Sequence, residues 1–121
     1  MLKAFNQTRG VVLCPHLESA GGMAGKSRGL LGRDGLDQDA GMLFDAGRLE
    51  PFMWMHMFFM RFPIDIVFLS RAGTVLSISH NLKPWRLSPP VWGACQALEL
   101  TAGAAKRTGT QPGDLVVIEP A

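Results

Sequence analysis

The sequence predicts a mainly β protein, at the margin of the α+β class: a single small antiparallel sheet curled into a partly closed barrel, with about seven short strands and two short helices. Three observations favour this fold. The 121 residues are enough for one domain with one core. Fourteen Gly and eight Pro indicate many turns. The apolar runs between these turns are short, as in small all-β domains. We therefore expect residues 1–121 to form a single domain.

A hairpin, a helix and a strand are expected at the amino-terminal end. Leu2–Asn6 and Val11–Cys14 are separated by a turn near Thr8–Gly10, which predicts two paired strands. Ser19–Gly35 carries spaced apolar residues and predicts one irregular helix, although Gly29 and Gly32 weaken it by about 1 kcal/mol each relative to Ala. Gly41–Phe44 is then a short apolar strand, because turn residues follow it.

The middle of the chain predicts a strand followed by a hairpin. Large side chains alternate over Phe52–Met57, with three methionines on one face and other large side chains on the opposite face, as the period of two in a strand requires. Ile64–Leu69 is nearly all β-branched or aromatic, which is typical of a strand covered on both faces. A tight Ala-Gly turn joins it to Thr74–Ser79, so this pair is the clearest hairpin of the sequence.

A long loop and three short elements complete the chain. Asn81–Gly93 contains three Pro and two Trp and predicts an extended loop. Ala97–Leu100 predicts a strand, and Ala102–Lys106 predicts one short helical turn. Leu115–Glu119 is the last strand, after a Pro-Gly-Asp turn. An antiparallel sheet of such short strands tends to close toward a barrel.

Composition and charge exclude several classes of protein. Charged residues make up 18% and hydrophobic residues 47%, which excludes a disordered, highly charged chain. The net charge of +2 falls far short of the basic surface that nucleic acid binding requires. The most apolar stretch, Pro51–Met60, is too short for a membrane span, which takes about 20 residues. We therefore expect neither nucleic acid nor a membrane as a partner.

The cysteines and the amino terminus predict the compartment. Cys14 and Cys95 lie far apart and in no metal-ligand spacing, which favours two reduced thiols. No apolar run typical of a signal peptide follows Met1. The sequence therefore predicts a soluble, cytoplasmic protein without a cofactor, present as a monomer or a weak dimer.

A series of short motifs runs in one order through most of the chain. The motifs are Arg28-Gly-Leu-Leu-Gly-Arg33, Gly41-Met-Leu-Phe44, the block Trp54–Asp65, Gly73-x-Val75, Leu98-Glu-Leu100 and Pro112-Gly-Asp114. Together they resemble the small prokaryotic family called domain of unknown function 192, over roughly residues 27–118. The resemblance implies a small, mostly β domain. It implies no activity, because the family has no established reaction.

One departure from the family pattern lies just before Asp65. The usual pattern resembles Phe-Trp-Met-Lys-Asn-Thr, whereas this chain, aligned back from Asp65, has Met55-His56-Met57-Phe58-Phe59-Met60. Apolar residues thus replace the polar Lys-Asn-Thr triplet. A role that depends on those polar groups is therefore not carried over to this chain.

Asp65 is the most informative polar residue of the sequence. It lies within the otherwise apolar segment Phe62–Leu69, where a carboxylate is costly unless it is paired or hydrogen-bonded. One interpretation is a buried acid or base at a functional site. The other is a structural carboxylate that accepts hydrogen bonds from turn amides, or that pairs with an arginine such as Arg28, Arg33 or Arg61.

Glu99 and His56 are the candidate partners of Asp65. Strand alternation places Glu99 opposite its two neighbouring leucines, so it is exposed if those leucines face the core. In a curled sheet with a polar interior, Glu99 could instead meet Asp65 across a cleft, like the carboxylates of a glycosidase. An imidazole titrates near neutrality, which suits His56 to general base catalysis. These residues support a small hydrolase or lyase as the alternative function, with the catalytic residues otherwise unknown.

Met53, Met55 and Met57 support a lesser alternative, a Cu(I)-binding protein. Three thioethers on one face of a strand suit Cu(I), which soft ligands select. His56 points to the other face of such a strand and cannot share a metal with all three. The competing interpretation is that these flexible side chains fill irregular gaps in the core. No metal site is therefore assigned.

The proline-rich loop Asn81–Gly93 carries Trp85, Arg86 and Trp92. Aromatic and arginine side chains on loops are frequent anchors of recognition surfaces, although the loop's two indoles could instead close one end of the barrel. The two arginines of the Arg28-Gly-Leu-Leu-Gly-Arg33 motif could each bind a carboxylate or a phosphate through two parallel hydrogen bonds. The sequence therefore favours a non-enzymatic binding or interaction module for an unknown small molecule or protein. Its expected contacts are Arg28, Arg33, His56, Asp65, Trp85, Arg86 and Glu99.

Overall fold

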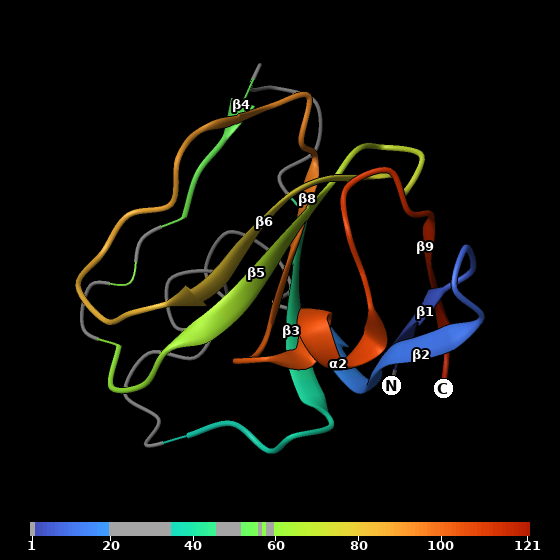
Figure 1. Ribbon diagram of the computed structural model, residues 1–121, viewed down its shortest axis with the longest axis horizontal. Coiled ribbons are helices and arrows are strands. Elements are labelled where there is room, and N and C mark those ends of the chain that lie inside the picture. Colours follow the sequence, from blue (N-terminus) through green and yellow to red (C-terminus); the bar gives the residue numbers. More distant parts are fainter. Residues whose placement is uncertain (1, 20–34, 46–51, 56, 58–59) are drawn as a thin grey trace.

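One curled sheet dominates the computed structural model, which describes residues 2–19, 35–45, 52–55, 57 and 60–121. Its strands are β1 (Leu2–Asn6), β2 (Val11–Ser19), β3 (Ala40–Asp45), β5 (Ile64–Leu69), β6 (Val75–Leu82), β8 (Gln96–Thr101) and β9 (Val116–Pro120). They follow the order β6-β5-β8-β3-β2-β1-β9 and form a half-barrel (Figure 1). The prediction of a mainly β protein with a partly closed barrel is confirmed.

All but one of the strand pairs in this sheet are antiparallel. The predicted hairpins β1–β2 and β5–β6 are both present. The exception is β2–β3, which is parallel, with His16 opposite Ala40 and Ser19 opposite Leu43. A parallel pair needs a long crossover connection rather than a tight turn, and the twenty residues that separate these two strands in the sequence supply that length. The sheet therefore departs here from the purely antiparallel prediction.

One short helix, α2 (Ala104–Thr108), lies in the part of the chain that the structure describes. It confirms the helical turn predicted at Ala102–Lys106, shifted by two residues. The helix packs against β2 and β5 at one end of the half-barrel (Figure 1). The other predicted helix, Ser19–Gly35, falls almost entirely outside the described residues. None of the described helical structure is long and apolar enough to cross a membrane.

The two faces of the sheet carry separate apolar clusters, because side chains alternate along each strand. The inner cluster draws residues from all seven strands and from α2, and it includes Val67, Leu98 and Leu100. The outer cluster lies on the other face of β3, β5 and β8. Its buried members are Met42, Phe44, Met53, Met57, Met60, Ile64, Ile66, Phe68, Val91, Ala94 and Ala97.

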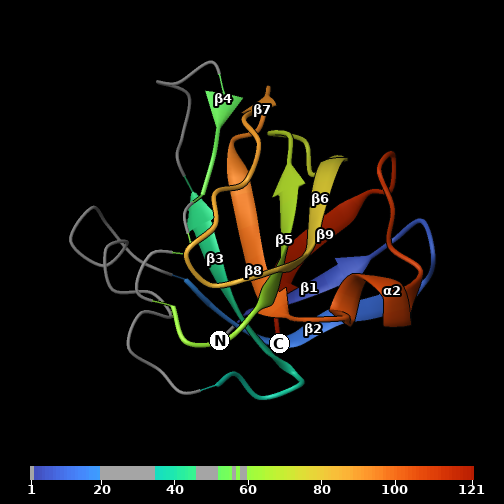
Figure 2. The same cartoon turned by 60° about the vertical axis from the view of Figure 1, so that its left-hand side comes forward.

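A small ribbon covers the outer face, and we define it as residues 52–55, 57 and 84–92. It begins with a separate two-stranded sheet, β4 (Phe52–Met53) and β7 (Val91–Trp92), seen at the top of Figure 2. The strand predicted over Phe52–Met57 therefore ends at Met53. Beyond it, the Met55 N–H donates to Ser88 Oγ at 2.8 Å, so the pairing with the second segment continues through irregular bonds. The loop predicted over Asn81–Gly93 begins too early, because Asn81 and Leu82 belong to β6, and it contains the short strand β7.

The two edge strands of the half-barrel, β6 and β9, meet at one end. Thr74 and Leu115 form an isolated antiparallel bridge there, and the Val116 N–H donates to the Gly73 carbonyl at 2.8 Å. Gly73 has φ +97°, and a Cβ at this position would collide with the Val116 carbonyl oxygen. Glycine is therefore required where the two edges close on each other.

Candidate functional site

Asp65 joins its own strand β5 to strand β6 and to the start of α2. It is 1% exposed, in β5. Its Oδ1 accepts a hydrogen bond from the Asn81 N–H at 2.9 Å, and Oδ2 accepts from the N–H groups of Gly103 and Ala105 at 3.1 Å each. The last two donors lie at the start of α2, so Asp65 caps this helix from a neighbouring strand. Among the described residues its partners are all backbone amides, which agrees with the structural interpretation of this carboxylate.

Glu99 is buried on the opposite face of the sheet. It is 5% exposed, and in register it lies opposite Met42 of β3 and Ile66 of β5. Both neighbours belong to the outer cluster, so the carboxyl group lies in an apolar layer. No hydrogen bond or ion pair joins it to another residue of the described chain. Burial raises the pKa of Glu99 from 4.5 to about 7.

Strand alternation left open whether Glu99 is exposed or buried, and the structure answers this question. Its neighbours Leu98 and Leu100 do face the core, as members of the inner cluster. The glutamate is nevertheless buried, because the outer face has a cluster of its own beneath the ribbon. Both faces of β8 are therefore covered.

The two carboxylates do not share a cleft. In the β5–β8 register Asp65 lies opposite Leu100, and Ile66 lies opposite Glu99. Successive residues of a strand point to opposite faces, so the sheet itself separates Asp65 from Glu99. The carboxylate pair considered for a hydrolase or lyase is therefore not formed. The other candidate partner, His56, lies outside the described residues.

Four large apolar side chains of the ribbon are exposed. They are Trp54 (47% exposed), Trp85 (59%), Leu87 (54%) and Trp92 (67%). Within the described chain, Val12 is the only other large apolar residue that is exposed. Trp92 is in β7, and Trp54 comes directly after β4, the strand that pairs with β7. These exposures argue against indoles that close one end of the barrel.

Cationic side chains accompany these apolar groups. Residues 52–94 contain four of the twelve basic residues of the sequence and one of the ten acidic residues, Asp65, which is buried. Arg61, Lys83 and Arg86 are exposed. The exposed surface of this part of the chain is therefore positive. Arg28 and Arg33, the two arginines predicted to bind a carboxylate or a phosphate, lie outside the described residues.

The methionines of the ribbon belong to the core. Met53 is 8% exposed and Met57 is fully buried, both in the outer cluster, and Met55 packs against that cluster. This is the gap-filling arrangement that competed with the Cu(I) interpretation. No group of three or more His, Cys, Asp or Glu side chains in the described chain is arranged to hold a metal ion.

A polar pocket of about 490 Å³ lies where β2 and β3 run parallel. It is lined by His16, Glu18, Asp37, Gln38, Asp39 and Ala40. All of these except the alanine are exposed, so the carboxylates are solvated. The nearby thiol of Cys14 is buried and lies 3.5 Å from the Asp39 carbonyl oxygen. Burial raises the pKa of this thiol to about 11, which keeps it protonated and unreactive at neutral pH.

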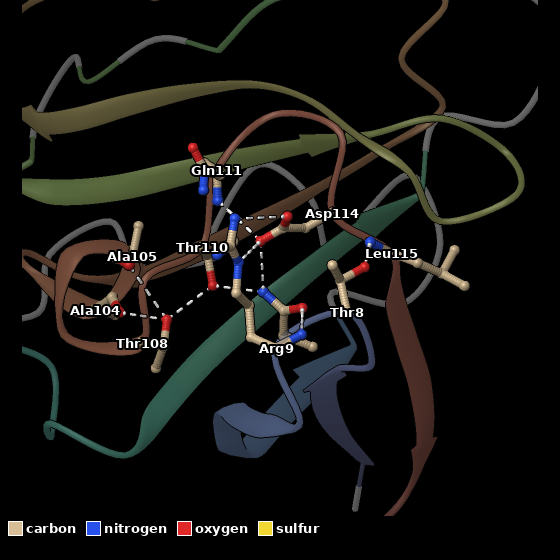
Figure 3. A network of polar contacts seen from close by, with 10 residues as sticks. Thr8, Arg9, Ala104, Ala105, Thr108, Thr110, Gln111, Asp114 and Leu115 are labelled. Atoms are coloured by element: carbon tan, nitrogen blue, oxygen red, sulfur yellow. Dashed lines mark hydrogen bonds and ion pairs between the residues drawn. The ribbon is translucent and has the colours of Figure 1, made fainter.

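A buried polar network joins the β1–β2 turn to the segment after α2, as Figure 3 shows. Asn6 is fully buried, and its Nδ2 donates to Thr110 Oγ1 at 2.9 Å and to Asp114 Oδ2 at 3.0 Å. Arg9 Nε donates to the same oxygen at 3.0 Å, and this contact holds the pKa of Asp114 below its usual value. Sequence reasoning missed this network. Its only signal was the Pro-Gly-Asp turn that ends at Asp114.

Comparison with known proteins finds one family and two similar crystal structures. The family model DUF192, described as an uncharacterized ACR, matches residues 4–118. A candidate transcription regulator from Sinorhizobium meliloti 1021 superposes with a TM-score of 0.77 at 30% identity, covering 96% of this chain and 90% of that one. A protein of unknown function from Novosphingobium aromaticivorans DSM 12444 gives a TM-score of 0.78 at 28% identity, with coverages of 96% and 82%. No curated protein matches the chain.

Proposed function

This chain belongs to the DUF192 family, and we propose that it is a recognition module whose ribbon binds an acidic segment of a partner protein. Apolar or proline side chains of that segment contact the exposed indoles, and its carboxylates contact the surrounding cations. The single observation that carries this proposal is the concentration of exposed tryptophans on one short ribbon.

The exposed apolar groups support an interaction surface because they are gathered in one place. Isolated exposed apolar residues are normal, whereas clusters of them mark binding sites. Four of the five exposed large apolar residues in the described chain belong to the ribbon. Tryptophan and arginine are also the residue types that most often dominate binding energy at protein interfaces. Trp85 and Arg86 are adjacent members of this set.

The charge around the ribbon supports an acidic partner. Arg61, Lys83 and Arg86 are exposed there, and the one acidic residue of the same stretch is buried on the other face of the sheet. Complementary charges raise the rate of encounter and disfavour partners of like charge. A basic segment is therefore disfavoured on this surface.

The backbone of the ribbon is fixed in a way that suits recognition. Trp85 has φ +66°, an uncommon conformation for a bulky residue, and its N–H donates to the Met57 carbonyl at 2.7 Å. Asn81, where the chain leaves β6, has φ +50° and is held by Asp65. Constrained conformations of this kind concentrate at functional sites. A preorganised loop also loses less entropy when it binds.

Selection from a library of short random peptides tests the proposal. The full-length protein is immobilised, and the peptides it retains are sequenced. We expect enrichment of peptides that combine Asp or Glu with aromatic or proline residues. The affinity of a selected peptide, measured by fluorescence anisotropy, falls as salt is added. The double variant Trp85→Ala/Trp92→Ala weakens it by about tenfold or more, since interface tryptophans carry a large share of binding energy.

Val12→Ala is the matched control, because Val12 is exposed but lies in β2, away from the ribbon. We expect this variant to bind the peptide like the wild type. Enrichment of basic peptides, or equal binding by the double variant, contradicts the proposal. Two further arms use anionic phospholipid vesicles and a single-stranded oligonucleotide. Stronger ribbon-dependent binding of the oligonucleotide would favour the class of function described for the Sinorhizobium protein and reject a peptide partner.

A further inference from the structure

Glu99 lies in the layer that joins the ribbon to the sheet. It is opposite Met42 and Ile66, and these belong to the same outer cluster as Met53 and Met57 of the ribbon. The inward side chains of the ribbon and the carboxyl group of Glu99 therefore share one buried layer. At 5% exposure Glu99 has no described hydrogen-bond donor or cation to balance a negative charge.

We propose that Glu99 is a proton-operated switch that controls the ribbon: the neutral acid permits the ribbon to pack on the sheet, and the carboxylate loosens it. Its predicted effect on binding rests on the proposed function of the ribbon. Its predicted effect on the packing of the ribbon does not. The inference thus assigns a regulatory role to a residue that lies beneath the binding surface rather than in it.

The ribbon is the part of this layer that yields most easily. A buried carboxylate without a partner is much more costly than a neutral acid, so ionisation favours any movement that admits water. The sheet strands β3, β8 and β5 are held by long hydrogen-bonded ladders. The ribbon is not part of that sheet, and its hydrogen bonds, such as that from the Met57 N–H to the Arg86 carbonyl, join its two segments to each other, so it can move as one rigid unit. Methionine side chains also adapt readily to a changed environment.

The switch operates in the neutral pH range. The raised pKa of Glu99, about 7, places its ionisation there. Other charged groups lie on the surrounding elements. On β3, Asp45 is exposed at the strand end, and on β5, Asp65 faces the inner cluster. Arg61 and Arg86 are exposed. His56 lies outside the described residues, so its titration must be separated by mutation.

Tryptophan fluorescence tests the switch without any ligand. All three tryptophans of the chain, Trp54, Trp85 and Trp92, lie on the ribbon, and the sequence has no tyrosine. Emission and acrylamide quenching of the full-length protein therefore report on the ribbon alone. We expect quenching to increase as the pH rises from about 5 to 9, with a midpoint near 7. Glu99→Gln, which cannot ionise, should remove this transition.

Glu119→Gln is the matched control, because it makes the same change at a surface ion pair in β9. It should leave the transition unchanged. Far-ultraviolet circular dichroism checks that each variant folds, and Glu99→Met is a second neutral variant suited to a methionine-rich layer. A wild-type protein whose quenching does not change between about pH 5 and 9 overturns the inference. A transition that persists in Glu99→Gln belongs to another group, such as His56, and also overturns it.

Binding of the selected acidic peptide separates this inference from the proposed function. We expect the wild type to bind it more tightly at about pH 6 than at about pH 8, and Glu99→Gln to bind equally at both. A fluorescence transition without any peptide binding supports the switch and rejects the function. Peptide binding without a fluorescence transition supports the function and rejects the switch.

Discussion

Asp65 and Glu99 are two buried carboxylates on neighbouring strands, and they differ in almost everything except burial. Asp65 is 1% exposed and Glu99 is 5% exposed. Asp65 accepts three backbone hydrogen bonds, from β6 and from the start of α2. Glu99 lies among methionine and isoleucine side chains with no described partner, and its pKa is raised to about 7. The two acidic residues thus have different roles on the two faces of one sheet: Asp65 holds backbone N–H groups, and Glu99 lies in an apolar layer.

The difference shows that the partners of a buried acid decide its role. A carboxylate that receives several hydrogen bonds can hold elements of the fold together. A carboxyl group without partners is stable only when neutral, so its charge depends on pH. Asp65, the residue that the sequence singled out, belongs to the first kind. Glu99, which alternation alone could not place, belongs to the second.

Replacement of each acid by leucine should give the largest contrast. Asp65→Leu leaves three N–H groups without their acceptor and should lower the free energy of unfolding by about 3–5 kcal/mol. Glu99→Leu removes a poorly solvated group from an apolar layer and should leave stability unchanged or raise it at neutral pH. Urea unfolding followed by circular dichroism measures both. Similar losses in the two variants would show that the comparison between the acids is wrong.

The pH dependence of stability tests the role of Glu99 next. In the unfolded chain Glu99 ionises near 4.5, and in the folded protein near 7. Between these values the folded state binds more protons, so its stability falls as the pH rises. The difference amounts to about 3 kcal/mol between low and high pH. Urea unfolding at a series of pH values should show this decline in the wild type and not in Glu99→Gln. An equal decline in both would assign it to other groups.

The periodic parts of the fold could be predicted from the sequence because they depend on local patterns. The strand predicted at Ile64–Leu69 has the same bounds in the structure. Alternation also predicted large side chains on two faces over Phe52–Met57. The regular strand nevertheless stops at Met53, and beyond it Met55 pairs with Ser88 through both the backbone and the side-chain hydroxyl of the serine. A hydrogen bond to a distant side chain leaves no periodic signal in the sequence.

The relations between strands were beyond the sequence for the same reason. Alternation placed Glu99 opposite its own neighbours in β8, but the relation of Glu99 to Asp65 depends on the β5–β8 register. A shift of one residue would reverse which side chains share a face. The network of Asn6 and Asp114 joins residues more than a hundred positions apart. Such contacts are fixed by the tertiary fold, which local patterns do not specify.

The hydrogen-bond network at Asp114 should make a smaller contribution to stability. This contribution is lost as the pH falls, whereas that of Glu99 is lost as the pH rises. Hydrogen bonds from Arg9 and Asn6 keep the pKa of Asp114 below its usual 3.8, against a smaller opposing effect of burial. The stability that it contributes is present above 3.8 and is lost as the pH falls through its lower folded pKa. Asp114→Asn should therefore cost about 1–2 kcal/mol at neutral pH and reduce the loss of stability in acid. Acid titration of both proteins, followed by circular dichroism, checks this. A variant as stable as the wild type at neutral pH would contradict a structural role for the network.

The smallest effect on stability is expected at the outer side of the ribbon, where the proposed binding surface lies. Trp92 is 67% exposed, so Trp92→Ala should change the free energy of unfolding by less than about 0.5 kcal/mol. Met57, buried on the inner side of the same ribbon, provides the comparison, and Met57→Ala should cost about 2–5 kcal/mol. Thermal and urea unfolding measure both variants. If Trp92→Ala is as destabilising as Met57→Ala, the indole supports the fold. Its exposure would then no longer favour a binding role for the ribbon.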